Sequence, residues 1–121
     1  MIYLATPYSH ADAATREARF DMACRIAGAM MRRGEVVFSP IAHSHPIAAL
    51  CQLPDGWEYW QTQAREWFEA CTSLVIARMD GWRESKGIAG EIKLARQMGI
   101  PVEFHSVEWL LREQDVPKEH A

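Results

Sequence analysis

Residues suited to anion binding and to nucleophilic chemistry fall close together in residues 81–104, GWRESKGIAGEIKLARQMGIPVEF. Ser85 is the expected N-cap of a helix whose first turn holds Lys86, Gly87 and Ile88. Unpaired N–H groups in such a turn, together with the helix dipole, favour a bound anion. Gly87 would also let a ligand approach the backbone closely. The stretch therefore suits a phosphate, although a serine that only caps the helix fits the sequence about equally well.

Glu91 lies six residues after Ser85, about one and two-thirds turns further along the helix, so its side chain is expected to face the same site. A carboxylate kept ionised there by the helix dipole and by Lys86 would stabilise or attack a cationic sugar carbon as a glycosidic bond breaks. A solvated surface glutamate is the plainer alternative. Two glycines in the opening turns, Gly87 and Gly90, are unusual for a helix, and Gly90 beside Glu91 counts slightly against that alternative.

Two histidines, His43 and His45, form an H-x-H pair after the second predicted strand, with Asp55 and Glu58 as further possible ligands. The pair permits a metal site, but no third ligand stands at a recognised spacing, so we expect no metal and interpret the histidines as lining a polar pocket. The chain has neither a Walker A loop nor a G-x-G-x-x-G motif, which excludes nucleotide hydrolysis at a P-loop.

The elements that must position these residues follow from apolar periodicity. Strands are predicted at 2–5, 35–40, 73–79 and 100–104, and helices at 11–33, 57–71, 85–98 and 106–113. Residues 40–56 hold three prolines and are expected to form a loop with one short helix at most. This alternation predicts an α/β fold, a Rossmann-like (flavodoxin-like) parallel sheet of four to five strands with helices on both faces. A ligand is then expected at the carboxyl ends of the strands.

Bulk composition predicts one cytoplasmic domain spanning the 121 residues, with a polar tail from about residue 115. The net charge of -3 and the lack of a basic block argue against a nucleic-acid partner. The sequence shows no signal peptide and no apolar run of about 18 residues, which argues against a membrane. Cys24, Cys51 and Cys71 form no C-x-x-C pair, so we interpret them as reduced packing residues.

Three segments carry a resemblance to a known family: IYLATPYS at the start, FSPIAHSHPIA after the second strand, and GWRESKGIAGEIKLARQMGIPV. They resemble a small family of largely uncharacterised bacterial proteins related to the nucleoside 2-deoxyribosyltransferases and nucleotide N-glycosidases. The likeness covers most of residues 1–104. Its last segment is the most specific, because Ser85, Gly87 and Glu91 are matched together.

The resemblance implies an enzyme that acts on a nucleotide or nucleoside, a glycosidase or deoxyribosyltransferase without a cofactor. Glu91 matches its nucleophile, which attacks the anomeric carbon and releases the base. Ser85 matches a serine that contacts the phosphate, and Tyr8 matches an aromatic residue near the sugar and base; Tyr8 joins Glu91 as a catalytic candidate. The other candidate substrate-binding residues are Ala5, Pro7, Ser39, His43, His45, Trp82, Gly87 and Ile88.

One position departs from the family pattern. Relatives commonly carry an aspartate four residues after a tryptophan of the second helix, whereas here Trp60 is followed at that spacing by Ala64. Neither Glu58 nor Glu66 occupies the matched position. A nucleotide-binding or sensing module without turnover is therefore the alternative function, and a metal-dependent hydrolase using the two histidines is a weaker one.

A homodimer or higher homo-oligomer is also expected. The helices predicted at 11–33 and 57–71 carry more apolar surface than one sheet face can cover. The tryptophans of the second of these helices suit either the core or a subunit interface. The family resemblance adds that related enzymes complete their sites across a subunit boundary.

Overall fold

Four parallel strands form the sheet in a computed structural model that describes residues 1–113. The strands are β1 (Ile2–Ala5), β2 (Val37–Phe38), β3 (Ser73–Ala77) and β4 (Val102–His105), in the order β2-β1-β3-β4. This confirms the predicted Rossmann-like fold with a parallel sheet. The predicted polar tail lies outside the described residues.

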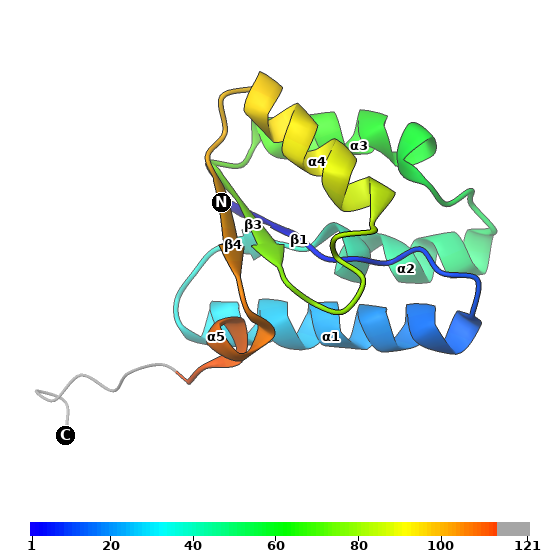
Figure 1. Cartoon of the computed structure of the whole chain (residues 1–121), viewed down its shortest axis with the longest axis horizontal. Coiled ribbons are helices and arrows are strands. Elements are labelled where there is room, and N and C mark those ends of the chain that lie inside the picture. The colour runs from blue at the N-terminus through cyan, green and yellow to red at the C-terminus, as the bar shows by residue number, and fades with distance from the viewer. Residues whose placement is uncertain (114–121) are drawn as a thin grey trace, which may run out of the picture.

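Helices cover both faces of the sheet (Figure 1). On one face α1 (Ala13–Arg32) packs against α5 (Val107–Leu111), and on the other α3 (Trp57–Glu69) packs against α4 (Lys86–Gln97). The remaining helix, α2 (Pro40–Cys51), contacts α1 and β1. Successive strand residues point to opposite faces, so each face of the sheet has its own apolar core.

β1 shows this alternation clearly. Tyr3 and Ala5 belong to the core under α3 and α4, whereas Leu4 belongs to the core under α1 and α5. Because both faces are covered, the central strands read as continuous apolar runs rather than as alternating ones. That is the pattern from which β1 and β3 were predicted.

The helix α2 is longer than the sequence predicted. The three prolines of residues 40–56 suggested one short helix at most, yet α2 runs for 12 residues with Pro46 inside it. Ser39 caps it by accepting the Ala42 N–H at 3.2 Å, and Pro40 occupies the first turn, where its missing N–H costs nothing. An interior proline removes a hydrogen bond without forbidding the helix, and α2 is also supported by its packing against α1 and β1.

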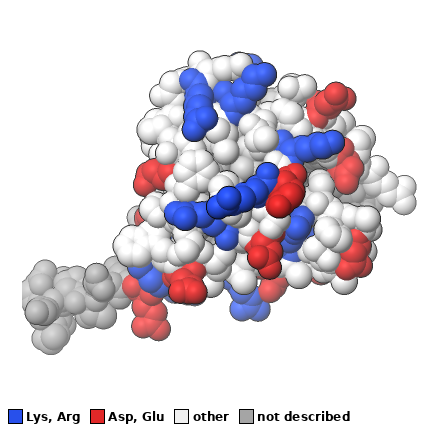
Figure 2. Space-filling view, viewed as in Figure 1, with Lys and Arg blue, Asp and Glu red and all other residues white. Residues whose placement is uncertain are grey.

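Basic and acidic side chains are interspersed on the face of the molecule shown in Figure 2.

The three cysteines differ in their exposure. Cys71 is buried, as predicted for a packing residue, but Cys24 and Cys51 are exposed, so the packing interpretation was wrong for these two. They lie on outer helix positions, where apolar spacing alone does not distinguish a buried from an exposed cysteine.

Within residues 1–113, none of the helices combines the length and the apolar character needed to cross a membrane.

Candidate functional site

A cavity of about 1260 Å³ opens at the carboxyl ends of the strands. It is lined by the loop after β1, the start of α1, the helices α2 and α3 with the loop between them, and the start of α4. The chain passes from β1 to β2 on one side and later to β3 on the other, so the sheet order reverses at β1. Ligands of open α/β sheets bind at such a reversal, which is where the sequence predicted the site.

Glu91 lies at the inner end of this cavity and is buried, with 8% of its surface exposed. Its Oε2 accepts a hydrogen bond of 2.5 Å from the Tyr3 hydroxyl. Tyr3 is itself fully buried in the core and stacks on Phe68, with 3.9 Å between the ring centroids. The orientation of Glu91 is therefore set by a rigid aromatic pair beneath it.

Burial also sets the protonation of Glu91. Loss of hydration raises the pKa of Glu91 to about 8, and the hydrogen bond from Tyr3 opposes this increase only in part. The expectation that the helix dipole and Lys86 keep this carboxylate ionised was therefore wrong. Lys86 is exposed at the helix start, where water screens its charge, so burial is the larger effect.

The packing around α4 explains why two glycines occur in its first turns. A Cβ atom at this position would lie 2.3 Å from Cε2 of Trp57, so the indole packs directly on the helix backbone beside Glu91. At Gly87 a Cβ atom would meet only the Ser85 hydroxyl, at 3.7 Å, and Gly87 lines the cavity. One glycine thus admits an aromatic wall and the other leaves room for a ligand.

The start of α4 presents a set of hydrogen-bond donors to the cavity. Ser85 is its N-cap, as predicted, and its Oγ accepts the Ile88 N–H at 3.1 Å. The N–H groups of Lys86 and Gly87 have no acceptor within residues 1–113, and both residues line the cavity. The Ser85 hydroxyl proton and these two N–H groups form what we call the anion site. Ile88 does not belong to it, because its N–H is already bound and its side chain is buried.

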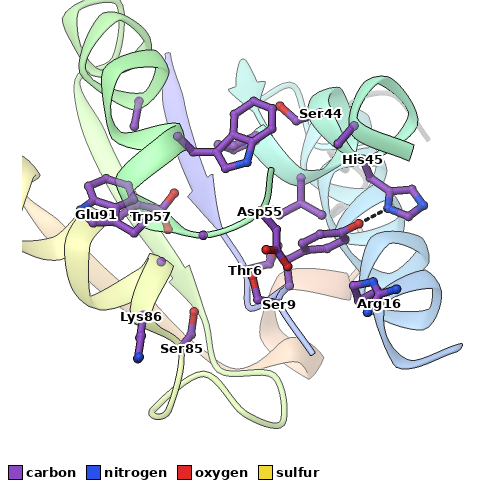
Figure 3. Close-up of a pocket in the computed structure, with 18 of the residues that line it drawn as sticks. Thr6, Ser9, Arg16, Ser44, His45, Asp55, Trp57, Ser85, Lys86 and Glu91 are labelled. Atoms are coloured by element: carbon purple, nitrogen blue, oxygen red, sulfur yellow. Dashed lines mark hydrogen bonds between the residues drawn. The ribbon is translucent and has the colours of Figure 1, made fainter. Parts of the chain in front are cut away.

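A chain of hydrogen bonds joins three residues in the wall of the cavity opposite Glu91. The Tyr8 hydroxyl lies 2.5 Å from His45 Nδ1, and His45 Nε2 lies 2.8 Å from Glu17 Oε2. All three residues line the cavity, together with Arg16 and Asp55. Burial raises the pKa of Tyr8, and the positive charge of Arg16 partly opposes this effect. Figure 3 shows the Tyr8 bond as the dashed line ending at His45, across the cavity from Glu91.

The structure brings together five of the predicted site residues. Those that line the cavity are Tyr8, His45, Ser85, Gly87 and Glu91. Those outside its lining are Ala5, Pro7, Ser39, His43, Ile88 and Trp82.

Each residue outside the lining has another structural role. Ala5 and Pro7 are buried beneath the cavity, and Ser39 caps α2. His43 is exposed and packs edge-on against Trp67, at 5.7 Å between centroids, and Trp82 packs on Phe104. Position after a strand predicted the neighbourhood of the site but not the direction of each side chain.

Sequence reasoning missed several lining residues. Thr6 follows β1 directly, is 4% exposed, and its hydroxyl group has no hydrogen-bond partner within the described chain. Because Thr6 directly follows a strand, its position could have identified it as a candidate site residue. Tyr3 lies inside an apolar strand, and Arg16 and Glu17 lie on a long helix, so no local pattern distinguished them.

Ala64, where relatives are expected to carry an aspartate, does line the cavity and is 1% exposed. Glu58 lines it too, whereas Glu66 does not. Residues 1–113 contain no group of three or more His, Cys, Asp or Glu side chains placed to hold a metal. His43 and His45 have different partners, Ser44 and the Tyr8–Glu17 pair respectively.

The chain belongs to the DUF1937 family, a domain of unknown function, whose family model matches residues 1–107. No curated protein is significantly similar to the sequence. The family description assigns no activity, so the likeness to deoxyribosyltransferases remains a prediction.

Proposed function

We propose that this DUF1937 protein cleaves the N-glycosidic bond of a nucleotide or nucleoside, with Glu91 as nucleophile. One observation carries the proposal: a buried, oriented carboxylate and an open anion site lie on one helix and line one cavity. A nucleoside monophosphate has the matching layout, because its phosphate and its anomeric carbon are held apart by one sugar ring.

The proposed reaction uses the chain's own groups. The anion site binds the phosphate through the Ser85 hydroxyl and the N–H groups of Lys86 and Gly87. A Glu91 oxygen attacks the anomeric carbon as the bond to the base breaks, and the bonding electron pair leaves with the base. Water, or a second base, then displaces Glu91 from the sugar. The Tyr3 hydroxyl holds the carboxylate in its attacking orientation throughout.

A nucleotide-binding or sensing module without turnover is the second candidate. Ala64 favours it, because this residue faces the cavity where relatives are expected to place a carboxylate for sugar binding or proton transfer. A site without that group would retain the phosphate contacts and the aromatic wall. It would then bind the ligand without accelerating the chemical step.

Incubation with a panel of ribo- and deoxynucleoside monophosphates, with chromatography of free base, tests the proposal. We expect base release by the wild type and none by Glu91→Gln, while nucleotide affinity stays within about tenfold, because the carboxylate acts mainly in the transition state. Glu66→Gln, on α3 and outside the cavity, is the matched control and should retain activity.

Three results separate the candidates. Turnover that survives Glu91→Gln removes this residue from the mechanism. Nucleotide binding by the wild type without base release supports the binding module. If no nucleotide or nucleoside binds, both candidates fail.

A further inference from the structure

The hydrogen-bond chain from Glu17 through His45 to Tyr8 fixes where its protons lie. A carboxylate can only accept, so the 2.8 Å contact between Glu17 Oε2 and His45 Nε2 places a hydrogen on Nε2. In a neutral imidazole the other nitrogen then carries a lone pair. His45 Nδ1 therefore accepts the Tyr8 hydroxyl proton across 2.5 Å.

This arrangement determines what Tyr8 offers to a ligand. Its single proton is committed to His45, so only lone pairs of the Tyr8 oxygen remain for the cavity, and they can only accept. The imidazole is held firmly, because the His45 side chain is 13% exposed and its ring stacks on Phe20 with 4.3 Å between centroids.

Asp55 supplies a second acceptor at this end of the cavity. It lines the same cavity as Tyr8, and its negative charge contributes to the raised pKa of Tyr8. Hydrogen-bond donors also line this part of the cavity, namely Arg16, whose Nη1 donates to the carbonyl oxygen of His10, and the Thr6 hydroxyl group. Figure 3 shows Asp55 between Glu91 and His45 in the view across the cavity.

We infer that Tyr8 and Asp55, with the Tyr8 proton held by His45, select a nucleobase that carries an exocyclic amino group. The amino N–H groups donate to the two acceptors, whereas an oxo group at the same place would face acceptors with no proton between them. The inference rests on the proposed function, in which the anion site and Glu91 take the phosphate and the sugar and leave this end for the base.

Calorimetric titration with two matched pairs of nucleotides tests the selection. Adenosine and inosine monophosphates, and cytidine and uridine monophosphates, differ by an amino or an oxo group at one position, and the oxo member also carries a hydrogen on the adjacent ring nitrogen. Glu91→Gln serves as the background protein, so that no substrate is consumed. We expect the amino member of each pair to bind at least about tenfold more tightly, as for one hydrogen bond to a charged group.

Substitutions in the wall test the assignment of residues. Tyr8→Phe and Asp55→Asn should each bring the affinity ratio of a pair towards one. His45→Phe keeps a ring to stack on Phe20 but releases the Tyr8 proton towards the cavity. It should weaken the amino member and strengthen the oxo member, a crossing that general loss of structure does not produce. Ser85→Ala is the control, because it should weaken both members of a pair equally.

Each remaining result has a definite meaning. A wild-type ratio near one, or a preference for oxo bases, overturns the base selection while leaving the proposed glycosidase intact. Equal losses for both members in His45→Phe overturn the role of His45 in holding the Tyr8 proton. If none of the four nucleotides binds, the base selection is overturned, and the panel of ribo- and deoxynucleoside monophosphates decides the proposed function separately.

Discussion

Glu91 is under two opposing demands. A nucleophile must be ionised, but burial raises the pKa of Glu91 to about 8, so Glu91 is mainly the neutral acid at neutral pH. We therefore expect kcat/KM for base release to rise about tenfold per pH unit below about pH 8 and to level off above it. A pH–rate profile between about pH 6 and 10 measures this. A rate that falls with rising pH would instead make Glu91 a proton donor.

The same shift links Glu91 to stability, which provides an independent measurement. The folded-state pKa lies above the unfolded value, so the folded chain holds a proton that the unfolded chain has lost between about pH 4.5 and 8. Its contribution to the free energy of unfolding is present below this window and declines across it, by at most about 1.4 kcal/mol per pH unit. In Glu91→Gln this part of the decline should vanish from denaturant titrations. An unchanged pH profile in the variant would contradict the raised pKa.

At the scale of elements, the start of α4 has two roles that a matched pair of caps separates. Ser85 caps α4 and Ser106 caps α5, and each Oγ accepts a backbone N–H at 3.1 Å. Ser85→Ala and Ser106→Ala should each lower stability by about 1 kcal/mol. Only Ser85→Ala should also weaken nucleotide binding, by about 10- to 150-fold, while nucleoside binding barely changes. Equal effects on nucleotide and nucleoside would refute the anion site.

The packing of Trp57 on α4 gives a second test at this scale, with two glycines as a matched pair. Gly28 lies inside α1 with open space around its Cα, so Gly28→Ala should stabilise the protein by roughly 0.5 to 1 kcal/mol through helix propensity. Gly90→Ala places a methyl group where the Trp57 indole lies, so the ring must move. We expect altered tryptophan fluorescence, no gain in stability and weaker ligand binding. A stabilisation equal to that of Gly28→Ala would contradict this packing.

Some elements and contacts of this fold could be predicted from the sequence, and others could not. Periodicity predicted α1, α3 and α4, because each presents apolar residues to one sheet face at helical spacing. It also predicted that Ser85 and Glu91 share a site, since both lie on α4. It could not predict the contact between Tyr3 and Glu91, which are 88 residues apart, or the chain from Glu17 to Tyr8. Such contacts depend on how elements pack. Because of its prolines, the sequence also failed to predict the full length of α2, which forms one wall of the cavity.

For the whole molecule, the two loops that carry site residues are joined through one side chain of α1. Arg19 Nη1 donates to the Ser9 carbonyl oxygen at 3.0 Å, in the loop after β1. Its Nη2 donates to the Asp80 carbonyl oxygen at 3.5 Å, in the loop after β3. The sheet order brings the ends of β1 and β3 together, and Arg19 fastens their loops. The cavity is thus a property of the assembled fold and not of any single segment.

Exposed apolar residues lie on α2 as well as on the two helices from which the sequence predicted an oligomer. Part of the surplus on α1 is covered within the chain, because Leu110 of α5 packs with Ile26 and Met30. By contrast, α2 carries no charged residue, yet it leaves Ile47 partly exposed and Leu50 86% exposed. An uncharged, largely apolar helix is ordinarily covered. If the predicted oligomer forms, α2 is the surface we expect it to use.

The predicted dimer can be tested by sedimentation of the wild type and two variants at micromolar concentration. We expect at least a dimer for the wild type and a monomer for Leu50→Glu, because burying an unpaired charge in an apolar interface opposes association. Met31→Glu on α1 is the matched control, since Met31 is also exposed and should leave the dimer intact. Dissociation by Met31→Glu alone would place the interface on α1, as the sequence suggested. A monomeric wild type would show that the exposed face of α2 has no partner in a second copy of this chain.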